Sequence, residues 1–63
     1  MLDIKISLAA ARVNAEMTQD EVAKAVSVSK TTVVSWEKGK TEPKASQLLQ
    51  LSELYKIPLS AIK

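Results

Sequence analysis

The side chains that could do chemistry in this chain are mostly lysines and small hydroxyl residues. The 63 residues include no histidine and no cysteine, so the commonest metal ligand and general base is missing, and so are thiolate ligands and disulfides. No nucleophile–base pair, paired carboxylates or phosphate-binding glycine loop is visible. We therefore expect that the protein is not an enzyme and that it binds no metal, other cofactor or small-molecule ligand.

Positive charge is concentrated in the middle of the chain. The net charge is +2, and the charges sum to −2 over residues 1–23, to +3 over residues 24–44 and to +1 over residues 45–63. A basic stretch of this kind can bind nucleic acid, or it can simply be a solvated face. Charge alone leaves both interpretations open.

Length and composition indicate one small soluble domain over residues 1–63. A chain this short buries only about 60% of the surface that its unfolded form exposes, and 46% of its residues are apolar, mostly aliphatic. No apolar run has the length of a membrane span, and the first residues do not have the order of charges of a signal peptide. We expect a cytoplasmic protein that does not associate with a membrane.

Helical patterns cover most of the chain, and no strand pattern is visible. The first helix is predicted from an N-cap at Asp3 to about Asn14, with Ile4, Leu8 and Ala11 on one face. Another is predicted over about 44–55, with an apolar stripe of Leu48, Leu51, Leu54 and Tyr55, and with Tyr55 half-buried. Residues 57–62 end the chain as a short turn. With two further helices in the middle, the prediction is a compact all-α bundle of five short helices.

The two middle helices are joined almost directly. Thr18 and Glu21 have the spacing of a capping box, and Ser29 is a good N-cap for a second helix only a few residues after the first one ends. A joint this short requires the helices to cross steeply. In the second helix Val33 and Trp36 should point inward, while the opposite face is small and mostly uncharged. Gly39 is predicted to end it in the left-handed conformation.

Residues 19–38 resemble the helix-turn-helix of the Cro and phage-repressor class, also called the xenobiotic-response-element class. The resemblance is carried by Val22, Ala23, Val26, Val28, Val33 and Trp36, followed by "WEKGKTEP". It extends to "LAAARVNAEMTQ" and "QLLQLSELYKIPLSAI", which resemble the first helix of the family and its last two. The sequence departs from the family at Ser27 and Glu16, where glycine is common, so the backbone should be strained at both residues.

The resemblance implies a lambda-repressor-like fold and a sequence-specific regulator of transcription, such as a phage-type or bacterial repressor. The partners would be a near-palindromic operator in double-stranded DNA and a second copy of the chain. The positions that would contact bases are Ser29, Lys30, Thr31, Val34 and Ser35. Those that would contact phosphates are Gln19, Thr32, Lys38, Lys40 and Thr41.

Two further sets of positions follow from the resemblance. Arg12 and Glu37 would form a structural ion pair, and the dimer interface would consist of Ile57, Pro58, Leu59 and Ile62. The alternative function is a protein-interaction module, an antitoxin-like or anti-repressor partner on the same fold. Short polar residues on the outer face of the second helix favour DNA, whereas a protein-binding surface should expose several large apolar or aromatic side chains.

Overall fold

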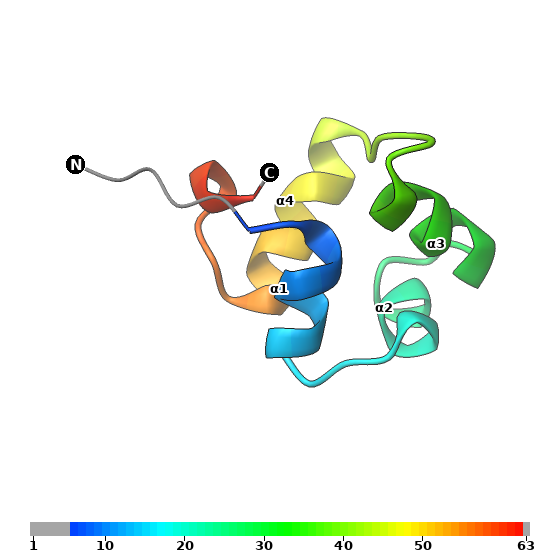
Figure 1. Ribbon diagram of the computed structural model, residues 1–63, viewed down its shortest axis with the longest axis horizontal. Helices are drawn as coiled ribbons and strands as arrows, with labels where there is room; N and C mark the ends of the chain where they lie inside the picture. The colour runs from blue at the N-terminus through cyan, green and yellow to red at the C-terminus, as the bar shows by residue number, and fades with distance from the viewer. Residues whose placement is uncertain (1–5, 63) are drawn as a thin grey trace.

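Four α-helices and one 3₁₀ turn make up residues 6–62, the part of the chain that the computed structural model describes (Figure 1). The elements are α1 (Leu8–Asn14), α2 (Gln19–Ala25), α3 (Lys30–Lys38), α4 (Ala45–Tyr55) and η1 (Leu59–Ala61). Within this range the extended pairing is limited to one isolated parallel bridge, between Ile6 and Ile62. The all-α prediction is confirmed, although the fifth helix is only a three-residue 3₁₀ turn.

The predicted start of the first helix was wrong. Helix α1 begins at Leu8, after an N-cap at Ser7 whose hydroxyl accepts a hydrogen bond from the N–H of Ala10 at 3.1 Å. The N–H of Ile6 instead donates to the carbonyl of Ala61 at 2.7 Å, so this part of the chain is bonded to the last turn. The predicted N-cap Asp3 and the predicted inward Ile4 lie outside the described residues.

The two middle helices begin with side-chain caps as predicted, and α3 ends at the predicted glycine. The Thr18 hydroxyl accepts from the N–H of Glu21 at 3.1 Å, and the Glu21 carboxylate accepts from the N–H of Thr18 at 2.8 Å, which confirms the capping box. Ser29 caps α3 by accepting from the N–H of Thr32 at 3.2 Å. Gly39 ends α3 with φ of 75°, in the left-handed region where glycine costs least.

The core is formed where the four helices meet. Helix α1 packs against both α3 and α4, and α2 packs against α3 (Figure 1). The buried cluster consists of Ala11, Val22, Ala23, Val26, Val33, Trp36, Leu51 and Tyr55. The prediction that Tyr55 is half-buried was wrong, since only 5% of this residue is exposed. Both aromatic residues of the chain therefore belong to the core.

Among residues 6–62, three residues other than glycine have a positive φ near 58°: Glu16, Ser27 and Lys56. Glu16 and Ser27 are the two positions at which strain was predicted, and Lys56, which ends α4, was not predicted. A residue with a Cβ enters this region at a cost of about 1–2 kcal/mol. In the described range no helix is long and apolar enough to cross a membrane.

Candidate functional site

The joint between α2 and α3 places α3 directly against α2. The N–H of Val28 donates to the carbonyl of Ala23 at 2.9 Å, so the turn folds back over the end of α2. Ala23 is buried at this point, and a larger side chain would push the helices apart. The turn contains only residues 26–29 between the two helices, and α3 starts as soon as Ser29 has capped it. One face of α3 is thus fixed to the core while the other faces outward.

The outward face of α3 carries the five predicted base-contacting residues. Ser29, Lys30 and Thr31 are exposed, and Val34 and Ser35 one turn later are half-buried. Val33 and Trp36, on the inner face, are 1% and 7% exposed. Among these five residues Lys30 is the one long cation, and the other four side chains are short.

The five predicted phosphate-contacting residues are distributed around this face. Lys38 is exposed at the end of α3, and Lys40 and Thr41 are exposed in the loop that follows. Thr32 is half-buried, and its hydroxyl lies 2.9 Å from that of Ser29. Gln19, at the start of α2, is also half-buried, and its amide donates to the carboxylate of Glu37 at 3.0 Å. These last two side chains already have partners within the fold.

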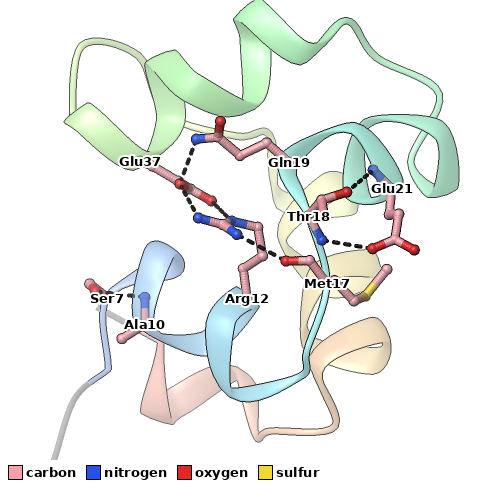
Figure 2. A network of polar contacts seen from close by, with 8 residues as sticks. All are labelled: Ser7, Ala10, Arg12, Met17, Thr18, Gln19, Glu21 and Glu37. Carbon is pink, nitrogen blue, oxygen red and sulfur yellow. Dashed lines mark hydrogen bonds and ion pairs between the residues drawn. The ribbon is translucent and has the colours of Figure 1, made fainter.

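An ion pair between Arg12 and Glu37 connects α1 to α3 (Figure 2). Arg12 Nε donates to Glu37 Oε2 at 2.7 Å and Nη2 donates to Oε1 at 3.3 Å, while Nη1 donates to the carbonyl of Met17 at 2.9 Å. The side chains of Arg12 and Glu37 are 17% and 7% exposed. The hydrogen bond to Glu37 raises the pKa of Arg12 above its already high value, so the guanidinium stays charged. The pair fixes α1, the segment before α2, and α3 to one another.

A second ion contact lies on the surface and was missed by the sequence analysis. Lys30 Nζ is 3.9 Å from Asp20 Oδ2, and both side chains are more than half exposed. The contact joins the first turn of α2 to the first turn of α3. No sequence pattern reveals it, because the two residues are neighbours only when the turn has folded. The Gln19–Glu37 bond was missed for the same reason. The bond from Arg12 to the Met17 carbonyl could not be predicted either, because every residue has a carbonyl.

The predicted dimer residues do not all face solvent. Pro58 and Leu59 are exposed, with Leu59 at 45%, whereas Ile57 is partly buried against the core. Ile62 is only 8% exposed and pairs with Ile6. Ile62 therefore has little surface left for a partner, and the dimer surface proposed below is based on the other three residues.

The described part of the chain offers no unsatisfied group that a bound ligand would have to complete. Each buried side-chain nitrogen or oxygen between residues 6 and 62 has a hydrogen-bond partner. Groups of three or more metal-binding side chains are also absent from that range. The candidate surface remains the one that the predicted residues form, on the exposed face of α3 and around it.

Comparisons with known proteins agree with this geometry. Residues 8–62 match the family described as helix-turn-helix. The chain is 33% identical over 51 residues to the cryptic phage CTXphi transcriptional repressor RstR of Vibrio cholerae. That alignment covers 81% of this chain and 46% of the relative, so the chain spans about half the length of that curated protein. No solved structure matches the chain. Because the family match covers most of its length, the chain belongs to the helix-turn-helix family.

Proposed function

We propose that the chain is a sequence-specific double-stranded-DNA-binding domain of a transcriptional repressor, acting in the cytoplasm. The observation that carries this proposal is the exposed first half of α3, where Ser29, Lys30 and Thr31 stand clear of the core. The major groove is about 12 Å wide and admits one α-helix. Short side chains allow that helix to approach the base edges closely.

In this arrangement α3 lies in the groove and α2 lies across the DNA backbone. Lys30 reads O6 and N7 of a guanine, Thr31 bonds a base edge or packs its methyl group on a thymine, and Val34 contacts a thymine methyl. Ser29 and Ser35 contact neighbouring base edges. The phosphates are held by Gln19, Thr32, Lys38, Lys40 and Thr41, which fix the position of the protein without selecting a sequence.

Two copies of the chain would bind one near-palindromic operator. One half-site gives an interface of only about 600–1,000 Å², which is typical of single modules. A two-fold dimer doubles this area and requires half-sites one helical turn apart. Ile57, Pro58 and Leu59 form the proposed dimer surface.

The alternative function, a protein-interaction module, has less support on this surface. Protein-binding hot spots are usually large apolar or aromatic side chains. Trp36 and Tyr55 are buried, and the large apolar side chains exposed among the described residues are Val13, Leu49 and Leu59, none of which is on α3. The outer face of α3 thus lacks the anchors that a protein partner would need.

Selection of binding sites from random duplex DNA tests the proposal. We expect enrichment of one sequence with two-fold symmetry, and half-sites separated by about 10 base pairs. Enrichment of no sequence, with uniform weak binding that salt abolishes, would leave only a basic surface and would contradict the proposed function. Capture of one cellular protein in place of DNA would support the interaction module.

A further inference from the structure

Lys30, the central cation of the proposed DNA-reading face, is close to a carboxylate. Its Nζ lies 3.9 Å from Asp20 Oδ2, and the side chains are 56% and 67% exposed. We infer that Asp20 is a specificity-determining residue, which restrains Lys30 and so weakens binding to DNA that lacks the operator sequence. This inference rests on the proposed function, and Asp20 is not among the residues proposed to contact DNA.

Asp20 differs from the other acidic residues of the helix-turn-helix in having no bond that serves the fold. Glu21 accepts the N–H of Thr18 in the capping box. The Glu37 carboxylate accepts hydrogen bonds from Arg12 and Gln19. Between residues 18 and 38 this leaves Asp20, whose carboxylate has its ion contact with Lys30. Its carboxylate is therefore free to act on the surface that DNA would approach.

Lys30 is equally distinct among the lysines. The described range contains six of them, and Lys30 is the one that has a carboxylate oxygen within 4 Å. The others on or after α3, such as Lys38 and Lys40, can neutralise a phosphate of any DNA without breaking an ion contact. Lys30 can do so only by leaving Asp20.

The loss of the contact with Asp20 affects the affinity for random DNA and the affinity for the operator differently. On random DNA, leaving Asp20 would give Lys30 one phosphate and release one counterion, but it would leave an unpaired carboxylate beside the phosphates, so Lys30 stays beside Asp20. On the operator, Lys30 gains the fixed pair of guanine acceptors, which outweighs the same loss. Asp20 therefore lowers the affinity for random DNA more than the affinity for the operator, and the ratio of the two increases.

The test compares Asp20→Asn with the wild type, using the selected operator and a scrambled duplex at several salt concentrations. An exposed ion pair is weak, so we expect Asp20→Asn to bind the scrambled duplex about two- to fivefold more tightly. The operator should gain less, so the ratio of the two affinities should fall. The slope of log affinity against log salt should steepen by about 0.9 for the scrambled duplex, as Lys30 then neutralises one more phosphate.

Two further variants identify the cause. In a Lys30→Ala background Asp20→Asn should no longer steepen the salt dependence, because the restrained cation is gone. Glu53→Gln removes the same charge from α4, where the side chain is exposed and has no ion partner among the described residues, and it should change the scrambled duplex less than Asp20→Asn does. Equal effects of Glu53→Gln and Asp20→Asn, or equal steepening without Lys30, would overturn the inference.

Failure of the inference can be told apart from failure of the proposed function. A wild-type protein that selects no DNA sequence contradicts the proposed function itself. A wild-type protein that selects a symmetric site, while Asp20→Asn leaves the scrambled duplex and its salt slope unchanged, contradicts only the role of Asp20.

Discussion

Lys30 is the longest of the side chains proposed to contact bases. We predict that Lys30→Ala relaxes the preference at one base pair of each half-site by about 1–3 kcal/mol, since a good pair of bonds to guanine is worth that much. Affinities for a set of operators with single substitutions measure this. A loss of the same size for every operator would instead assign Lys30 to a phosphate.

Tyr55 gives the fold a dependence on high pH. Burial, with a smaller contribution from the charge of Glu37, raises the pKa of Tyr55 to about 12, whereas the unfolded chain has the usual pKa of about 10. The folded state therefore holds the proton more tightly. The resulting stability is complete below about pH 10 and is lost as the pH rises through about 12.

Absorbance of tyrosinate follows this group directly, because the chain has a single tyrosine. We expect the folded protein to titrate well above free tyrosine, and Tyr55→Phe to lose less stability than the wild type between pH 10 and 12. Titration of the folded protein near pH 10, like a free tyrosine, would contradict the burial of the Tyr55 residue.

Among the contacts between helices, the ion pair of Arg12 and Glu37 joins α1 to α3, and Arg12 also bonds the segment before α2. The pair is largely buried, with 17% and 7% of the side chains exposed, so we predict that Arg12→Ala costs about 3–5 kcal/mol of the free energy of unfolding. It would leave a buried carboxylate unpaired and would also remove the donor to Met17. Urea denaturation measures the loss, which is large for a small domain.

The matched control is Lys24→Ala on α2, which removes an exposed cation with no ion pair among the described residues. It should change stability by less than about 0.5 kcal/mol. The Arg12→Ala variant, tested under conditions where it is folded, should select the same DNA sequence as the wild type. Unchanged stability together with weaker DNA binding would mean that Arg12 acts on DNA and not on the fold.

For the whole molecule, the proposed function requires two copies to meet on one operator. The proposed patch of Ile57, Pro58 and Leu59 is small, so we expect monomers at micromolar concentration that dimerise when the operator brings them together. Leu59 is 45% exposed, and Leu59→Glu should therefore keep the helical fold. It should abolish cooperative filling of the two half-sites while the affinity for an isolated half-site is retained.

Titration of full and half operators, with circular dichroism to follow the fold, makes this measurement. Val13→Glu places the same charge on an exposed apolar position of α1 that is 62% exposed, and it should leave cooperativity intact. If Leu59→Glu still fills both half-sites cooperatively, the copies meet through another surface.

The sequence by itself determined the parts of the fold that depend on neighbours within one helical turn. The capping box of Thr18 and Glu21, the cap at Ser29 and the left-handed Gly39 were all predicted correctly. The burial of Val33 and Trp36 was predicted from their spacing. These signals are local, because a cap joins residues three apart and a helical face repeats every three or four residues.

Only the tertiary structure decided the contacts between distant parts of the chain. The bond from Ile6 to Ala61 and the bridge between Ile6 and Ile62 join the segment before α1 to the last turn, where Ile62 is buried. The bond from Gln19 to Glu37 spans 18 residues, and the contact between Lys30 and Asp20 exists only because the turn brings α2 beside α3. A hydrogen bond requires its two atoms to lie within about 3 Å of each other. No local pattern can place residues so far apart in the chain that closely, so the packing of the helices must do it.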